Sequence, residues 1–105
     1  MVEYLMVSNI ASLNDTFRRS GFGVMMTQGI KNLPDLDGLM GTIRDFNRFN
    51  EDNDPYGERD FGSLDWYGEK VFWKIDYYDQ ALRVWEDPTS PTCQRVLTIM
   101  CADEY

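Results

Sequence analysis

Hydrophobic residues recur at helical spacing near the start of the chain, and this pattern predicts a first helix from Ser8 or Asn9 to about Arg19. Its apolar stripe, which we expect to face the core, consists of Ile10, Leu13 and Phe17. Arg18 and Arg19 fall in the last turn, where the helix dipole favours cations. Gly21 is suited to end the helix.

A second stripe at helical spacing predicts a helix from about Pro34 to Phe49. The stripe consists of Leu36, Leu39, Met40, Ile43, Phe46 and Phe49. Proline is favoured in the first helical turn, which suits Pro34. Between the two helices, residues 22–28 are short, apolar and closed by Gly29, which predicts a buried strand.

Alternating and continuous apolar runs in the second half of the chain predict strands. Two strands, residues 61–67 and 70–78, are expected to form a hairpin with Gly68 and Glu69 between them. On the second strand one face, expected in the core, carries Val71, Trp73, Ile75 and Tyr77, and the other carries Phe72, Lys74, Asp76 and Tyr78. Residues 95–102 predict a further apolar strand, and residues 82–85 a short edge strand.

These elements predict one compact domain over residues 1–105 of the α+β class. Two helices are expected to pack on one face of a mostly antiparallel sheet of four to five strands. The core is expected to contain Leu36, Leu39, Ile43, Phe46, Val71, Trp73, Ile75, Leu97 and Ile99. Residues 1–7 alternate weakly and fit a short strand, the start of a helix or a frayed end.

Charge changes the picture more than overall composition does, because the net charge of −8 is unevenly distributed. Residues 1–50 contain five acids and five bases, whereas residues 51–105 contain thirteen acids and five bases. An acidic protein lacks the basic patch that nucleic acid requires, so direct nucleic-acid binding and attachment to anionic membranes are not expected. The acidic excess instead favours a basic protein partner.

Several chemistries are excluded or weakened by missing residues. The chain has no histidine, which removes histidine-based triads and histidine-ligated zinc. It has no glycine-rich phosphate-binding motif. Cys93 and Cys101 form neither a disulfide framework nor a Cys-x-x-Cys pair. We expect no catalytic residue, no cofactor, no membrane segment and a cytoplasmic location.

Metal binding is the main alternative reading of the acidic residues. Asp52, Asp54 and Gly57 match positions 1, 3 and 6 of a calcium loop, but Tyr56 and Ser63 fill positions that need better ligands. A solvated turn is therefore the simpler interpretation. The spacing of acids before Lys70 and Lys74 does not match a common nuclease. A small metal-dependent enzyme or metal-binding protein that uses the Asp54–Asp60 loop with Lys74 and Asp76 stays open.

Aromatic residues lie among these acids, as in surfaces that bind proteins. The residues expected to contact a partner are Glu51, Asp52, Asp54, Tyr56, Glu58, Asp60, Asp65, Asp76 and Tyr78. Most of the acids among them are expected to share one exposed face. Tyr78 has a second interpretation, in which it caps the core together with Tyr77.

Three long motifs, DNDPYGERDFG at 52–62, VFWKIDYYD at 71–79 and RVLTIMCADEY at 95–105, resemble a small bacterial family catalogued as domain of unknown function 3768. The segment IASLNDTFRRSG at 10–21 resembles the opening helix of that family more weakly. The resemblance implies a gene often found on plasmids and other mobile elements. It implies no activity and no catalytic residue.

The charge and the resemblance together favour a non-catalytic acidic module over an enzyme. Carboxylates on a rigid loop and sheet can take the place of phosphates against a basic groove. We therefore expect an inhibitor of a nucleic-acid-binding host defence complex, of the anti-CRISPR or anti-restriction type, that acts as a nucleic-acid mimic. The sequence does not predict the oligomeric state.

Overall fold

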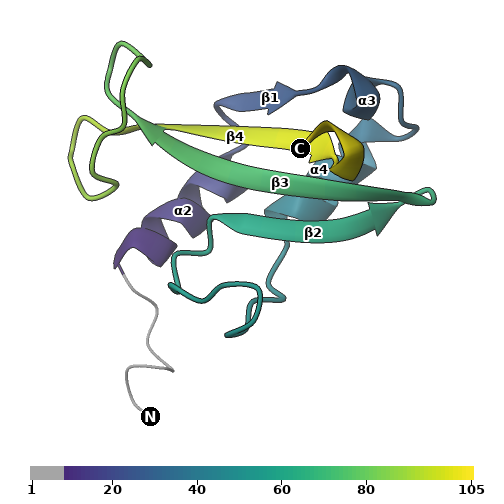
Figure 1. Cartoon of the computed structure of the whole chain (residues 1–105), viewed down its shortest axis with the longest axis horizontal. Coiled ribbons are helices and arrows are strands. Elements are labelled where there is room, and N and C mark those ends of the chain that lie inside the picture. The colour runs from purple at the N-terminus through teal and green to yellow at the C-terminus, as the bar shows by residue number, and fades with distance from the viewer. Residues whose placement is uncertain (1–8) are drawn as a thin grey trace.

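The sheet is organised around β4 (Gln94–Cys101), which is an interior strand although it comes last in the chain. In this computed structural model, which describes residues 9–105, the strand order is β1-β4-β3-β2 (Figure 1). β3 (Glu69–Tyr78) pairs antiparallel with both β4 and β2 (Phe61–Trp66), whereas β1 (Val24–Met26) pairs parallel with β4. The fold is therefore α+β with a mixed four-stranded sheet in the described chain.

The inner face of the sheet forms the core, as the alternation on β3 predicts. Val71, Trp73, Ile75 and Tyr77 are buried, and β4 adds Leu97 and Ile99. Leu39 and Ile43 of α4 (Leu36–Arg44) pack into the same cluster, together with Ile30 and Phe46. The nine predicted core residues are confirmed, with Leu36 partly buried at the edge. Figure 1 shows α2 (Asn9–Ser20) and α4 behind the sheet.

The second predicted helix is shorter than the sequence pattern indicates. It begins after Asp35, whose side chain caps it by accepting from the N–H of Gly38 at 3.1 Å, and it ends at Arg44. Pro34 therefore lies before the helix. Phe46 and Phe49 continue the apolar spacing outside the helix, because both rings pack edge-on against Trp73. A one-turn helix, α3 (Gln28–Lys31), was not predicted.

The predicted buried face of α2 is correct only in part. Ile10 and Phe17 are partly buried and pack against the core, whereas Leu13 is 38% exposed. The fully or nearly buried residues of the helix are Ala11, Asn14, Asp15 and Arg18. The spacing of apolar residues does not predict these buried positions, because the helix also packs through polar side chains that form their hydrogen bonds within the protein. The last-turn position of Arg18 is thus less important than its burial.

Two other strand predictions are also wrong in detail. Residues 22–28 contribute only the three-residue edge strand β1, in which Met25 is 62% exposed. Residues 82–85 form no strand and contribute one bridge, between Tyr78 and Trp85. The hairpin turn is Tyr67–Gly68 rather than Gly68–Glu69, with φ of 49° and 84°. Two positive φ values are typical of the turn that best matches hairpin twist.

The first residues of the chain, including the open prediction for residues 1–7, lie outside the described part. Within residues 9–105, no helix is long and apolar enough to cross a membrane.

Candidate interaction surface

The acidic loop, residues 50–60, is shaped by asparagine side chains in its first half. Asn50 Oδ1 accepts from the N–H groups of Asp52 at 2.8 Å and Asn53 at 3.0 Å. Asn53 Nδ2 donates to the carbonyl of Arg48 at 2.7 Å, and Asn53 Oδ1 accepts from the N–H of Asn50 at 2.8 Å. Such bonds let asparagine replace backbone groups in turns, so this part of the loop has a defined shape.

Asp54 closes the second half of the acidic loop. Its Oδ1 accepts from the N–H of Arg59 at 3.0 Å, and its carbonyl accepts from the N–H of Gly57 at 3.0 Å. Gly57 and Arg59 have φ of 65° and 56°, so the chain reverses sharply here. The predicted turn is present. The carboxylate of Asp54, which a calcium loop would need as a ligand, accepts a hydrogen bond within this turn.

A buried polar cluster fastens the acidic loop to α2 and β3; it consists of Asn14, Asp15, Arg18, Glu58, Arg59 and Tyr77. Asn14 Nδ2 donates to the carbonyl of Glu58 at 2.9 Å and to the hydroxyl of Tyr77 at 2.8 Å. The Tyr77 hydroxyl donates to Glu58 Oε1 at 3.0 Å. Burial raises the pKa of Tyr77, so its hydroxyl keeps its proton and remains a donor.

Asp15 joins two arginines within the same cluster. Its Oδ1 accepts from Arg18 Nη1 at 3.1 Å and its Oδ2 from Arg59 Nη1 at 2.8 Å. Arg18 also donates to the carbonyls of Ile43 at 3.0 Å and Phe46 at 2.9 Å, which links α4 to the loop. The acidic loop is therefore attached to both helices as well as to the sheet.

The carboxylates of the loop influence one another. The pKa of Asp60 is raised, first because the side chain is half-buried and then because Glu58, Asp54 and Asp76 lie near it. These acids repel one another because the nearest arginine does not neutralise them. Arg59 of the same loop is paired with Asp15 on α2 instead. A cation from outside would relieve that repulsion.

The structure separates the predicted partner-binding residues into two places. Glu51, Asp52 and Tyr56 are exposed at the tip of the acidic loop, and Tyr56 is 87% exposed. Three others in the loop, Asp54, Glu58 and Asp60, are half-buried, so the expected single exposed face is wrong for them. The remaining three lie on strands: Asp65 on β2, and Asp76 and Tyr78 on β3.

Asp65 and Asp76 each have a lysine partner on the sheet. Asp65 lies 3.4 Å from Lys70 Nζ near the hairpin turn, and Asp76 lies 3.0 Å from Lys74 Nζ. Pairing with Asp76 raises the pKa of Lys74. Asp65 is at the far end of β2 from Asp60, so the structure does not bring these two acids together.

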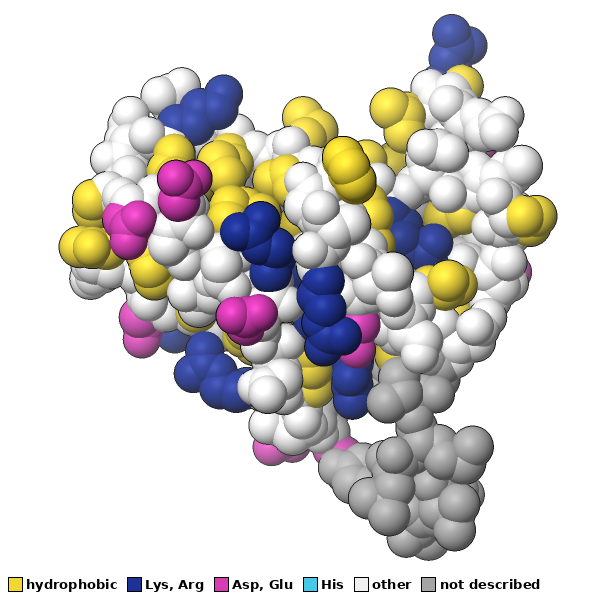
Figure 2. Space-filling view, turned by 180° about the vertical axis from the view of Figure 1, so that it is seen from behind, with side chains coloured by type: hydrophobic (Ala, Val, Ile, Leu, Met, Phe, Trp, Pro, Cys, Tyr) yellow, Lys and Arg dark blue, Asp and Glu magenta, His cyan; other side chains and the backbone are white. Residues whose placement is uncertain are grey.

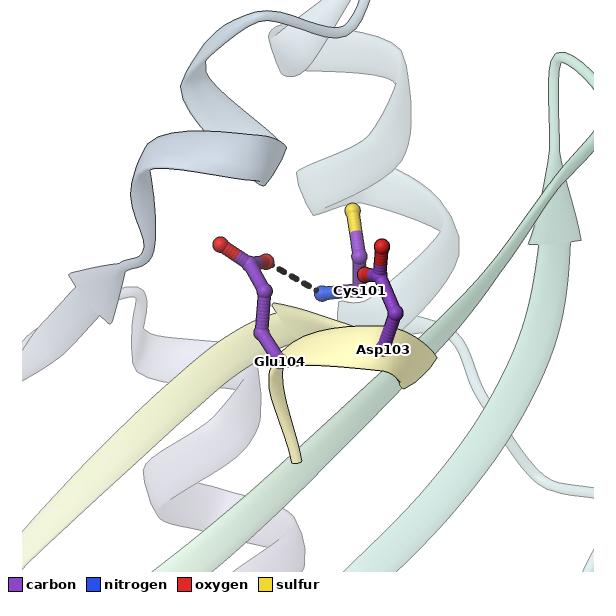
Figure 3. Close-up of side chains that lie close together, drawn as sticks. All are labelled: Cys101, Asp103 and Glu104. Carbon is purple, nitrogen blue, oxygen red and sulfur yellow. Dashed lines mark hydrogen bonds between the residues drawn. The ribbon is translucent and has the colours of Figure 1, made fainter.

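Ligand atoms close enough to share one metal ion occur elsewhere in the described residues, at Cys101, Asp103 and Glu104 (Figure 3). Glu104 is already occupied, because its carboxylate accepts from the Thr27 hydroxyl at 2.6 Å and from the N–H groups of Gly29 and Cys101 at 2.9 Å each. These bonds lower the pKa of Glu104 to about 2. Burial raises the pKa of the Cys101 thiol, which disfavours the metal-binding thiolate. The arrangement therefore serves as a joint between β4 and α3.

The sequence analysis did not predict the polar cluster, because its α2 members are charged or amide side chains, which are usually exposed on a helix. A signal was present, since Ala11, Asn14, Asp15 and Arg18 follow helical spacing as well as the apolar stripe does. The spacing of residues on the helix does not predict that Tyr77 would bond with Asn14 or that Arg59 would bond with Asp15.

A family model described as a protein of unknown function (DUF3768) matches residues 26–104 of the chain. No match was found among curated proteins or among solved structures.

Proposed function

Because this chain belongs to the DUF3768 family of proteins of unknown function, we propose its function from the geometry of the acidic loop. The protein is a non-catalytic binding module that docks this loop on a basic surface of a nucleic-acid-binding protein. The proposal places it in the cytoplasm with such partners. It acts as a mimic of nucleic acid, which suits an inhibitor of host defence encoded on a mobile element.

The observation that carries the proposal is that a preorganised loop displays acids that are not fully neutralised. Asn50, Asn53 and Asp54 set the shape of the loop, and Asn14 holds it against the helix. Glu51 and Asp52 then project from a rigid support, as phosphates project from a duplex. A rigid surface loses little conformational entropy on binding, so its charges contribute more to affinity.

The surface over α2 and α4 is a poorer candidate for this role. Figure 2 shows this side, where Lys and Arg side chains run across the middle of the surface with a few Asp and Glu side chains among them. The Lys and Arg side chains there make it less attractive to a basic partner. The acidic loop, with Tyr56 beside its acids as an exposed aromatic anchor, is the better match.

Affinity capture on the immobilised protein from a bacterial lysate tests the proposal, with elution by added duplex DNA. We expect DNA-binding proteins to be captured, and duplex DNA and salt to release them. The variant Glu51→Lys with Asp52→Lys should lose this capture, because both side chains are exposed and make no structural bond through their carboxylates in the described residues.

The matched control is Asp45→Lys with Glu69→Lys, which changes the net charge equally at two exposed positions outside the acidic loop. The control should retain capture. If both double variants bind equally, the loop has no special role. If duplex DNA releases nothing that the wild type captures, the mimicry proposal is wrong.

A further inference from the structure

The outer face of the sheet, opposite the core, carries a connected set of aromatic side chains. Strand alternation places Phe61 of β2 and Phe72 of β3 on this face. Their ring centroids are 5.3 Å apart, and Tyr105 adds a third ring at 6.2 Å from Phe61 and 5.6 Å from Phe72. Figure 1 shows this face toward the viewer, with α2 and α4 on the far side.

Other large side chains extend this aromatic set along both edges of the outer face. Trp85 pairs with Tyr78 in an antiparallel bridge, and directly paired residues project to the same side of a sheet. Met25 projects outward because Val24 and Met26 pack on the core. Trp85 is 68% exposed, Met25 62% and Tyr105 76%. Three large apolar side chains are therefore left exposed on or beside this face, and exposed apolar groups of this kind are typical of interaction sites when they gather on one surface.

The charged side chains on the outer face neutralise one another. Four of them alternate onto it, in the pairs Lys74–Asp76 and Lys70–Asp65. The strand side chains of this face therefore have no net charge, although the whole protein has a net charge of −8. Two copies that bind through this face bring no excess of carboxylates together, so their association is not opposed by local charge repulsion. A strongly charged partner would find no complementary charge here.

We infer that the outer face binds a second copy of this chain, so that two sheets stack face to face in a dimer. The 27 strand residues of the sheet, at ~3.3 Å per residue and ~4.8 Å between strands, cover roughly 430 Å² before side-chain relief is counted. Stable interfaces use about 800 Å² per partner, so Trp85, Tyr105 and the segments beside the sheet supply the rest of the contact.

The dimer gives the proposed function a second feature, since two acidic loops on one particle bind a repeated basic surface more tightly than one loop does. The inference does not depend on that function, because the acidic loop and the outer face carry separate substitutions and separate assays.

Sedimentation over the micromolar range tests the inference directly. We expect the wild-type protein to be a dimer whose dissociation constant changes little with salt, because the interface is apolar and neutral. Trp85→Asp should raise that constant about tenfold or more, as loss of a buried aromatic anchor does. Phe72→Asp should act in the same direction from the centre of the face.

Phe22→Asp is the matched control, since Phe22 is 76% exposed and lies with Leu13 and Phe17 beside α2. It should leave the dimer intact. Circular dichroism and thermal unfolding verify that each variant is folded. If Phe72→Asp does not fold, Trp85→Asp still tests the inference, because its side chain is exposed. A monomeric wild type, or a dimer that only Phe22→Asp dissociates, overturns the inference.

Discussion

Arg18 has no exposed surface, yet it carries a charge that is well satisfied. Its guanidinium donates to two carbonyls and to Asp15, and it lies 5.1 Å from the ring of Trp73 and 5.5 Å from that of Phe49. Burial lowers its pKa and Asp15 opposes that shift. One side chain therefore joins α2, the end of α4 and the aromatic core.

Replacing Arg18 with methionine should destabilise the fold strongly. The carbonyls of Ile43 and Phe46 lose their side-chain donor, and breaking a buried pair costs about 3–5 kcal/mol of unfolding free energy. Urea denaturation measures this. Arg19→Met, at an exposed neighbouring position, should change the free energy by less than about 0.5 kcal/mol. Equal losses at both positions would contradict the role given to Arg18.

Gly62 is required because the indole of Trp73 lies against it. A Cβ at this position would meet Trp73 Cε2 at 2.5 Å and Cζ2 at 2.7 Å. Gly62→Ala should therefore cost roughly 1–3 kcal/mol through overpacking. Gly41→Ala is the control, since its Cβ meets nothing within 4 Å and alanine favours the helix by up to about 1 kcal/mol. Chemical denaturation should show opposite signs for the two variants.

Asp60 should limit stability at neutral pH. Its pKa is raised by burial and by neighbouring acids, so the folded state holds the proton more tightly than the unfolded state. Stability from this group is complete below the unfolded pKa and is lost as pH rises through the folded pKa. Asp60→Asn should then raise the Tm at pH 7, with a smaller effect below pH 4. A Tm that falls at pH 7 would show that the carboxylate is needed.

At the scale of elements, the bounds of α2 and of the two long strands followed from the sequence, whereas those of α4 and of the short elements did not. β3 and β4 were predicted to within a residue at each end because alternation on a half-buried face has a strict period. α4 was overextended because Phe46 and Phe49 keep apolar spacing after the helix ends. α3 has no sequence signal, since its single turn is stabilised by Glu104 from the other end of the chain.

Glu104 should be the main acid-sensitive support of that joint between β4 and α3. Its pKa of about 2 means that its contribution to stability is complete above the ordinary glutamate pKa and is lost as pH falls toward 2. Glu104→Gln should lower the Tm at pH 7, and the difference should vanish near pH 2. Thermal melts across this range measure it. Asp103→Asn, on the same turn, should show a smaller difference.

At the scale of the whole molecule, the uneven charge was visible in the sequence, but its spatial arrangement was not. Counting assigned the excess of acids over bases to residues 51–105, yet only the fold shows that Asp65 and Asp76 are paired with lysines while Asp60 is crowded by other acids. Of the nine residues predicted to contact a partner, Glu51, Asp52 and Tyr56 are the ones that lie exposed at the loop tip. Its support was not predicted, because Asn14 and Arg59 are far apart in sequence.

The net charge of −8 predicts that salt stabilises the folded protein. Screening weakens repulsion among the acids, and the Debye length falls from about 10 Å at 0.1 M to about 3 Å at 1 M ionic strength. The Tm should therefore rise with sodium chloride over this range. The same salt should weaken capture of a basic partner, so the two trends oppose each other. A Tm that falls with sodium chloride would mean that surface ion pairs outweigh the repulsion.

The central position of β4 also determines when the chain can fold during its synthesis. β1 emerges early from the ribosome but pairs only with β4 in the described sheet, and the β2–β3 hairpin stays separate from β1 until β4 lies between them. Until residues up to Cys101 have emerged, the apolar faces of α4 and β3 have no complete core to enter. A nascent chain that still lacks β4 therefore has the β2–β3 hairpin but neither a partner for β1 nor a complete core.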